Sequence, residues 1–358
     1  MAPPSSKQWM SLAIEEAKKG EATAFPNPMV GCVLVDSKNR LISKGYHERP
    51  GGPHAERMTL TDVDVVSDGA VLYVTLEPCC SWGRTPPCTD IIFEKNIRHV
   101  VIGMLDPDPR MRGASVAVLE ERGIKVQVGV LEEECRQLNR RYLSIREQNR
   151  PTIALKAAIT VDGKIVGYHG DSKWITSSKT RMHAHQLRSI YDGILVGSQT
   201  VLHDDPKLNC RIEGGRNPTP ILLDTNAKCP QEAQVLHVGK RPLHCVGPHA
   251  PLRDELPVDR IVCSLAADGR IDIPPLLELL YEKGMYTVLV EGGAAIIQSF
   301  IRSGCVDVLE LYVGAKFLGG GRSFGEGCNF TLPEAPHLIL RSVSSLDSDV
   351  HLSYYWGD

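Results

Sequence analysis

The sequence predicts two successive α/β domains, and three observations support this fold class. The chain has 358 residues, which at about 100–200 residues per domain allows two domains with separate cores. Strand-like apolar segments alternate with helix-like segments, as in layered α/β folds. A polar segment ends at Pro151, a residue type that disfavours helix continuation. We therefore expect one domain at 1–147 and a second at 148–358.

The first half begins with a predicted helix over 6–19, because Trp9, Ala13 and Ala17 fall on one helical face and Gly20 follows as a stop signal. A long polar helix over 132–147 is expected to close this half. We expect helices on both faces of the sheet. The expected strands are 29–36, 41–47, 70–76, 99–105 and 125–130, and the further helices begin near His54 and cover 88–95 and 114–122.

The second half shows the same alternation of strand and helix patterns and is predicted to form a second α/β domain with its own core. The last segment, 337–356, is expected to form two strands joined by a polar turn. The other expected strands are 152–160, 192–197, 220–225, 260–265, 287–292 and 306–313, and the helices are 178–191, 274–283 and 294–303.

Composition excludes several classes of protein. Forty basic against 43 acidic residues give a net charge of −3, which argues against general electrostatic binding to nucleic acid. No apolar run approaches the roughly 18 residues needed to span a bilayer, and no secretion signal precedes the first helix. The odd number of 11 cysteines argues against a disulfide framework. We expect a cytoplasmic enzyme with no membrane or nucleic-acid partner.

Soft metal ligands cluster in the first half. His54 and Glu56 form an H-x-E motif, and Cys79 and Cys88 follow. One imidazole and two thiolates suit tetrahedral Zn²⁺ with the fourth position open for water, and zinc lowers the pKa of such water to about 7. Glu56 could take a proton from the water and deliver it to a departing amine. This order matches zinc deaminases apart from a longer spacer between the cysteines, and Cys80 is an alternative ligand.

Gly292 and Gly293 follow a predicted strand and open a predicted helix. Backbone N–H groups at such a position can approach a phosphate closely, although an ordinary turn explains the pair equally well. No G-x-G-x-x-G motif supports a Rossmann domain.

Longer motifs resemble the bifunctional deaminase–reductases of riboflavin biosynthesis, the RibD/RibG family. The resemblance covers nearly the whole chain. It implies a cytidine-deaminase-like three-layer domain followed by a dihydrofolate-reductase-like α/β domain. The motifs are PNPMVG (26–31), HAE (54–56), TLEPCCSWGRTPPCTD (75–90), DPDP (106–109), LKAAITVDGK (155–164), DSKWIT (171–176), GILVGSQTVLHDDPKL (193–208) and VEGG (290–293).

The resemblance implies zinc-dependent deamination of 2,5-diamino-6-ribosylamino-4(3H)-pyrimidinone 5′-phosphate, followed by reduction of the ribosyl group to ribityl with NADPH. It also implies a homo-oligomer, either a dimer or a tetramer. Residue by residue, it assigns His54, Cys79 and Cys88 to zinc, Glu56 and Asp204 to catalysis, and Asn27, Lys156, Arg188, Leu208 and Arg211 to the substrate. Ser172, Trp174, Thr176, Thr200, Glu291, Gly292 and Gly293 are assigned to the cofactor.

Departures from the family pattern gather in the first half. Ser81 stands where a histidine is usual, Arg57 follows the HAE motif, and Asp108 replaces the asparagine of DPNP. A carboxylate repels a phosphate, whereas Arg57, Arg110 or Arg112 could restore the attraction. Two alternatives therefore stay open: a relative that acts on another aminopyrimidine or pterin-like compound, and a reductase with a non-catalytic zinc module. The presence of Glu56 argues against the module.

Overall fold

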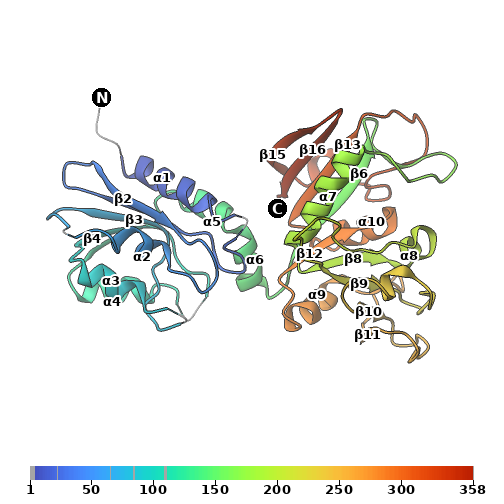
Figure 1. Ribbon diagram of the computed structural model, residues 1–358, viewed down its shortest axis with the longest axis horizontal. Coiled ribbons are helices and arrows are strands. Elements are labelled where there is room, and N and C mark those ends of the chain that lie inside the picture. The colour runs from blue at the N-terminus through green and yellow to red at the C-terminus, as the bar shows by residue number, and fades with distance from the viewer. Residues whose placement is uncertain (1–4, 22, 65, 84, 109–110, 358) are drawn as a thin grey trace. The chain divides into compact units, whose positions relative to one another are not determined.

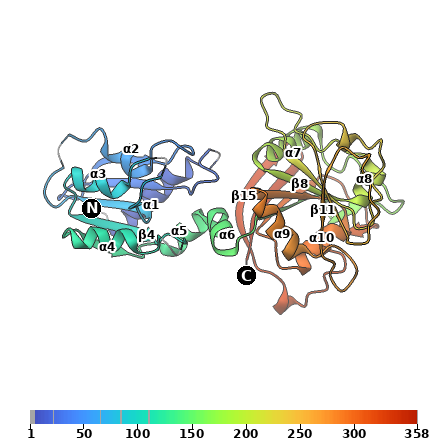
Figure 2. The same cartoon turned by 90° about the horizontal axis from the view of Figure 1, so that it is seen from below.

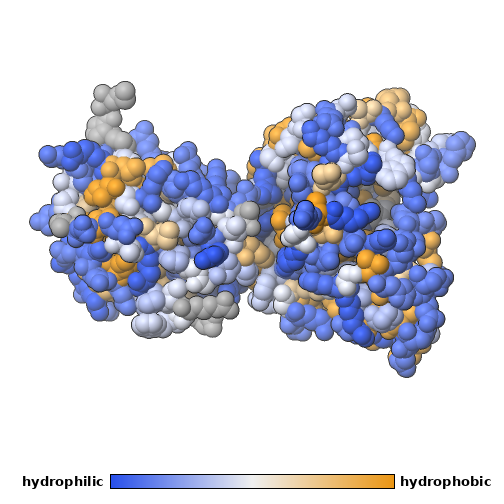
Figure 3. Space-filling view, in the orientation of Figure 1, coloured by the Kyte–Doolittle hydropathy of each residue, from blue (hydrophilic) through white to orange (hydrophobic). Residues whose placement is uncertain are grey.

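The computed structural model describes the chain in two compact units, residues 1–149 and 150–358. The described residues are 5–21, 23–64, 66–83, 85–108 and 111–357. Each unit has its own α/β sheet and hydrophobic core, so the predicted fold class is confirmed. Among the described residues, no helix combines the length and apolar character needed to cross a membrane. Hydrophilic side chains predominate on the face shown in Figure 3.

A mixed five-stranded sheet forms the middle layer of the first unit, in the order β2-β1-β3-β4-β5. β1 is antiparallel to β2 and β3, whereas β3, β4 and β5 are parallel. The carboxyl ends of β3 and β4 therefore meet at one edge of the sheet. The strands are β1 (Gly31–Val35), β2 (Leu41–Tyr46), β3 (Val71–Leu76), β4 (His99–Met104) and β5 (Lys125–Val128).

Two glycines show that helices cover both faces of this sheet. Gly31 pairs with Tyr46, and the next residue pairs with Gly45, so the two glycines face opposite sides. A Cβ on Gly31 would lie 1.9 Å from a carbonyl oxygen of α1, and one on Gly45 would lie 2.8 Å from Met58 of α2. Glycine thus allows both helices to pack closely. The helices are α1 (Ser6–Lys18), α2 (Ala55–Leu60), α3 (Cys88–Glu94), α4 (Ala114–Glu121), α5 (Glu132–Leu138) and α6 (Arg140–Gln148) (Figure 1).

The single helix predicted over 132–147 is wrong: it is two helices, α5 and α6, separated at Asn139. The Asn139 side chain is buried, its Oδ1 accepts from the Met29 amide at 2.8 Å, and its Nδ2 donates to the Met29 carbonyl at 3.0 Å. This long-range pairing holds Asn139 in place where the two helices meet. The sequence pattern alone carries no sign of it.

The second unit is built on a nine-stranded sheet in the order β11-β10-β9-β8-β12-β6-β13-β16-β15. The strands from β11 to β13 are parallel, and β16 and β15 extend the sheet in antiparallel fashion. The strands are β6 (Thr152–Thr160), β8 (Gly193–Gly197), β9 (Thr219–Leu223), β10 (Leu243–Val246), β11 (Asp259–Val262), β12 (Thr287–Glu291), β13 (Val308–Gly314), β15 (Leu338–Leu346) and β16 (Asp349–Trp356). A small separate sheet pairs β7 (Lys164–Val166) with β14 (Arg322–Ser323).

Helices cover both faces of this sheet as well (Figure 2). On β6, Ile153 and Leu155 share a core with residues of α9 and α10, whereas Ala154 shares another with Leu187 of α7. Because adjacent strand residues point to opposite faces, α7 lies opposite α9 and α10. Lys156, two residues from Ala154, is on the α7 face. The helices are α7 (Ser178–Ile190), α8 (Ser198–Asp204), α9 (Ile273–Glu282) and α10 (Ala294–Arg302), with short 3₁₀ turns at Gln234–Leu236 and Leu332–Glu334.

Most predicted elements of the second half coincide with observed ones, and three short strands were missed. These are β7, β10 and β14, which have two to four residues each, too few to show a period. The strand expected over 260–265 ends at Val262. Its last part turns away instead, and Leu265 bridges to Ile271.

Candidate active sites

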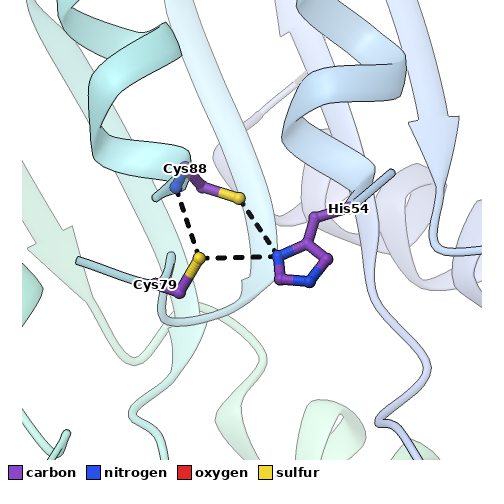
Figure 4. A group of neighbouring side chains, drawn as sticks. All are labelled: His54, Cys79 and Cys88. Carbon is purple, nitrogen blue, oxygen red and sulfur yellow. Dashed lines mark hydrogen bonds between the residues drawn. The ribbon is translucent and has the colours of Figure 1, made fainter. Parts of the chain in front are cut away.

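Three loops place the predicted zinc ligands together in the first unit. His54 caps the N-terminus of α2, Cys88 is the first residue of α3, and Cys79 lies in the segment after β3. The side chains point toward one another (Figure 4). His54 Nδ1 lies 3.5 Å from the Cys79 sulfur and 3.3 Å from the Cys88 sulfur.

The donor set fits zinc. The three candidate ligand atoms lie within 4.8 Å of one another, and one nitrogen with two sulfurs leaves one tetrahedral position for a reactant. The Cys88 amide donates to the Cys79 sulfur at 3.3 Å. The hydrogen bond from the Cys88 thiol, together with His54, lowers the pKa of Cys79 to about 4, so this sulfur is a thiolate, the form that binds metal.

The outer nitrogen of His54 has its own partner. Nε2 lies 3.4 Å from the Thr85 hydroxyl. When Nδ1 binds a metal, Nε2 would carry the proton and donate it to Thr85, and such a contact fixes the ring's tautomer and orientation. Sequence reasoning missed Thr85, because a hydroxyl six residues after a ligand has no distinctive spacing.

Glu56 lies in the first turn of α2 and is 3% exposed. Burial raises the pKa of its carboxyl group, and the nearby Cys79 thiolate raises it further. Its carboxylate is also hydrogen-bonded to the Cys88 side chain. A buried carboxyl group whose pKa is raised, placed beside a metal-ligand cluster, is suited to accept and return a proton.

Asn27 reaches the same site through His47, which sequence reasoning also missed. Asn27 Nδ2 lies 3.0 Å from His47 Nε2, and His47 Nδ1 lies 3.0 Å from the Pro53 carbonyl. Since the carbonyl requires a proton on Nδ1, Nε2 accepts from Asn27. The His47 and His54 rings meet edge to face at 5.3 Å. The Asn27 amide is therefore held in one orientation.

The residues that depart from the family pattern each contact a different part of the first unit. Arg57 Nη2 donates to the Pro87 carbonyl at 3.1 Å, so this arginine links α2 to the start of α3. Ser81 is exposed, and its hydroxyl lies 3.7 Å from the Met111 sulfur. The Asp108 amide donates to Asp106, and Arg112 is exposed. Arg110 lies outside the described residues.

Glu77, which follows β3, holds Asp106, Gly113 and Ser115. Its carboxylate is buried and accepts from the amides of these three residues and from the Ser115 hydroxyl, at 2.9 to 3.1 Å. Four donors on one carboxylate fix these three residues at the sheet edge where Cys79 lies.

A cleft of about 1560 Å³ opens over the carboxyl ends of the central strands in the second unit. Strand β8 continues to β9, whereas β12 continues past β6 to β13. The chain thus changes direction between β8 and β12, where parallel α/β sheets commonly bind ligands. Ten residues assigned from the resemblance line the cleft: Lys156, Ser172, Trp174, Arg188, Thr200, Asp204, Leu208, Glu291, Gly292 and Gly293.

Glu291 is the centre of a charged cluster in this cleft. Arg188 holds its carboxylate with two contacts of 2.8 Å, and Lys156 Nζ lies 3.9 Å away. Although burial alone would raise the pKa of Glu291, Arg188 and Lys156 lower it to about 2. Glu291 therefore stays ionised and fixes both cations.

Two assigned residues are not part of the cleft lining given by the described residues. Thr176 is buried, and its carbonyl accepts from Arg181, whose guanidinium stacks over Trp174 at 4.2 Å. Arg211 is exposed. Thr176 thus supports Trp174 from behind the cleft.

Comparison with known proteins identifies both domains. Residues 3–104 match the cytidine and deoxycytidylate deaminase zinc-binding region, and residues 151–352 match the RibD C-terminal domain. The riboflavin biosynthesis protein RibD of Bacillus amyloliquefaciens is 37% identical over 353 residues, which cover 96% of this chain and 95% of that protein. RibD of Aquifex aeolicus is 39% identical over 345 residues, 96% of each.

Solved structures of related proteins are also similar to this chain over 98% of its length. A diaminohydroxyphosphoribosylaminopyrimidine deaminase/5-amino-6-(5-phosphoribosylamino)uracil reductase from Thermotoga maritima is 37% identical, with a TM-score of 0.76 over 98% of both chains. Acinetobacter baumannii RibD is 31% identical, with a TM-score of 0.79 over 98% of this chain and 99% of that one.

A zinc-binding deaminase domain followed by a reductase domain in one chain defines a bifunctional deaminase–reductase. The chain belongs to the RibD family, whose members carry out both steps in riboflavin biosynthesis.

Proposed function

We propose that this enzyme deaminates 2,5-diamino-6-ribosylamino-4(3H)-pyrimidinone 5′-phosphate and then reduces the ribosyl group with NADPH, at two separate sites. The observation that carries the proposal is Glu56, which is buried beside the cluster of His54, Cys79 and Cys88. A purely structural zinc site needs no such carboxylate. The two activities by which the Thermotoga maritima relative is named support the same substrate class.

In the deaminase site, zinc held by His54, Cys79 and Cys88 would supply a Lewis acid that makes water nucleophilic at neutral pH. Glu56 takes the proton from the attacking water and passes it to the leaving amine, so no free acid is needed. Asn27 orients the pyrimidine through its amide Oδ1 and its second Nδ2–H, because the other Nδ2–H is already held by His47.

In the reductase site, the cleft residues bind and orient the reactants, while the hydride comes from NADPH. Gly293 is the N-cap of α10, where free backbone amides suit a phosphate. Ser172, Trp174 and Thr200 line the same cleft as cofactor contacts, and Thr176 acts through Trp174. Lys156 and Asp204 face the reacting ribose in this proposal.

The substrate phosphate is assigned to Arg188, Leu208 and Arg211. Arg188 is already paired with Glu291 and also donates to the Asn209 carbonyl at 3.1 Å. Arg211 is exposed, so it brings the charge that is free to turn toward the phosphate, and Arg188 shapes the pocket beside it.

The test supplies the full-length enzyme with the diaminopyrimidinone phosphate and follows ammonia release and NADPH oxidation together. We expect ammonia first, then NADPH oxidation. No ammonia with this compound, but release from another aminopyrimidine or a pterin, would support the altered-substrate alternative suggested by Ser81 and Asp108. No ammonia from any of them, with NADPH oxidised on the deaminated ribosyl compound, would support the reductase-only alternative.

Location and assembly belong to the same proposal. None of the 11 cysteines, all of which lie among the described residues, forms a disulfide, as is usual in the reducing cytoplasm. Strand β15 is an edge of the nine-stranded sheet and exposes Ile339, Leu340 and Val343, a surface that a second copy could cover. We place the enzyme in the cytoplasm as a dimer or tetramer. Light scattering that finds only monomers would contradict this assembly.

A further inference from the structure

The reductase cleft extends well beyond the residues assigned to the reaction. Its lining runs from Lys156 on β6, past Glu291 on β12 and Gly197 on β8, to Thr225 after β9. These strands are consecutive in the sheet, and neighbouring strands are about 4.8 Å apart, so the cleft crosses about 14 Å. Such a length suits an extended dinucleotide whose nicotinamide lies near Lys156. Its adenosine end would then reach Thr225.

The far end of the cleft combines apolar surfaces with one cation. Leu223, Ile271 and Ile273 provide apolar lining, Thr225 a hydroxyl group, and Arg270 a guanidinium. An adenine ring bound by apolar side chains, next to a positive charge, is the expected environment for an adenosine that carries an extra phosphate.

Of the other lysines and arginines that line the cleft, two are paired with Glu291 and two lie away from the end at β9. Lys156 and Arg188 pair with Glu291. Arg322 lies on β14, which pairs with β7, directly after β6, and Lys173 belongs to the loop that follows β7. Among the described residues that line the cleft, Arg270 is therefore the arginine or lysine nearest the end at β9.

The backbone fixes the position of Arg270. It follows Gly269 in a tight turn, where the Ala266 amide donates to the Arg270 carbonyl at 2.8 Å and the Gly269 amide to the Ala266 carbonyl at 2.9 Å. Gly269 has a φ of 77°, which glycine adopts without strain. The bridge between Leu265 and Ile271 closes this turn.

The same turn packs beside Thr225. Gly247 separates the two: a Cβ there would lie 3.0 Å from the Thr225 carbonyl oxygen and 3.3 Å from the Leu265 side chain. The preceding residue, Asp224, is fully buried and accepts from His244 at 3.0 Å and from the Cys229 amide at 2.7 Å. Both sides of the far end are thus held rigidly.

We infer that Arg270 binds the 2′-phosphate of NADPH and makes the reductase prefer NADPH to NADH, with the Thr225 hydroxyl as a second contact. This inference rests on the proposed use of NADPH. Among the described residues, Arg270 has one ionic neighbour, Asp268, at 3.9 Å, and both side chains are more than half exposed. Such a pair contributes little, so a dianionic phosphate displaces it readily.

The test measures dissociation constants for NADPH and NADH, by quenching of tryptophan fluorescence, on the full-length enzyme and on R270A. The loss of hydrogen bonds to a charged group should weaken NADPH binding about ten- to hundredfold. NADH binding should be unchanged, which also shows that the cleft is intact. The matched control is R241A, which removes another half-exposed, ion-paired arginine of the same unit and should change neither constant.

The outcomes separate the inference from the proposed function. Equal losses for both dinucleotides in R270A, or no loss at all, would overturn the role of Arg270 while leaving the reductase proposal intact. A rise in the KM of the ribosyl substrate alone would also overturn it, since Arg270 would then serve the substrate. A wild-type enzyme that binds neither dinucleotide would contradict the proposed function itself.

Discussion

The two active sites are organised in opposite ways. The zinc site is small, and its three ligands come from 35 consecutive positions, 54 to 88. The reductase cleft is about 1560 Å³, and its central ion cluster joins Lys156, Arg188 and Glu291 from three elements. In the first site the protein presents donors to a metal. In the reductase cleft, Lys156, Arg188 and Glu291 hold one another in place through ion pairs, and the reactants would bind in the cleft beside them.

This difference predicts how each site responds to the substitution of one residue. Removing one group from the zinc site should abolish a single activity and leave the rest of the chain intact. Removing one charge from the reductase cluster should destabilise the whole cleft, because an unpaired buried charge is costly.

The largest expected effect follows the change Glu56→Gln. The amide cannot accept the proton from water, so ammonia release should fall about 10²- to 10⁴-fold. Zinc content and NADPH oxidation on the deaminated compound should be unchanged. Glu94→Gln, at an exposed position of the neighbouring helix α3, is the matched control. Full ammonia release by the Glu56 variant would remove this residue from the mechanism.

The next effect is on stability, in the variant Glu291→Gln. The pKa of Glu291 is about 2, compared with an ordinary 4.5, so ionised Glu291 contributes about 3 kcal/mol to the free energy of unfolding. The variant should lose this amount at pH 7 in calorimetry or urea unfolding. Lys179→Gln, which breaks an exposed pair with Asp347, should cost less than about 1 kcal/mol.

The pH dependence has a definite sign. A carboxyl group whose pKa is lowered by folding stabilises the protein above its ordinary pKa, and this stabilisation is lost as the pH falls. The difference between wild type and Glu291→Gln should therefore be constant above about pH 5 and shrink below pH 4.5, toward 2. A difference that does not change down to pH 3 would show that Glu291 is not held by Arg188 and Lys156.

The smallest effect is expected for Thr85→Val. Loss of the hydroxyl removes the partner of His54 Nε2, which should weaken zinc binding about tenfold. Competition with a chelator measures the affinity directly. Thr61→Val is the matched control, because the Thr61 hydroxyl donates to a helix carbonyl away from the metal ligands. Equal zinc affinity in both variants would mean that His54 needs no support from Thr85.

That His54, Cys79 and Cys88 lie together could be predicted from the sequence because the metal chemistry they suggest is local. His54 and Cys88 stand at the starts of α2 and α3, Cys79 follows β3, and the residue types of all three suggest the metal. The roles of His47 and Thr85 could not be predicted in this way. His47 acts through the ring nitrogen that faces Asn27, and Thr85 acts on the ring nitrogen of His54 that faces it. The sequence does not show these orientations. In the reductase half, the motifs suggested that Glu291 belongs to the site, but its pairing with Arg188 spans 103 positions and depends on the packing of α7 against β12.

The fold was predictable for similar reasons. Strands with clear apolar runs were found, including all five of the first unit, whereas β10 is only four residues long and includes a histidine. The helix break at Asn139 depends on a contact with Met29, 110 positions away. Long-range hydrogen bonds of this kind are absent from local patterns.

The most direct test of the account is the zinc content of the purified full-length protein, measured by atomic emission beside the variant Cys88→Ser. The account predicts one zinc per chain in the wild type and little or none in the variant, with NADPH oxidation on the deaminated compound retained in both. A wild-type protein without zinc, or a variant with equal zinc content, would contradict it.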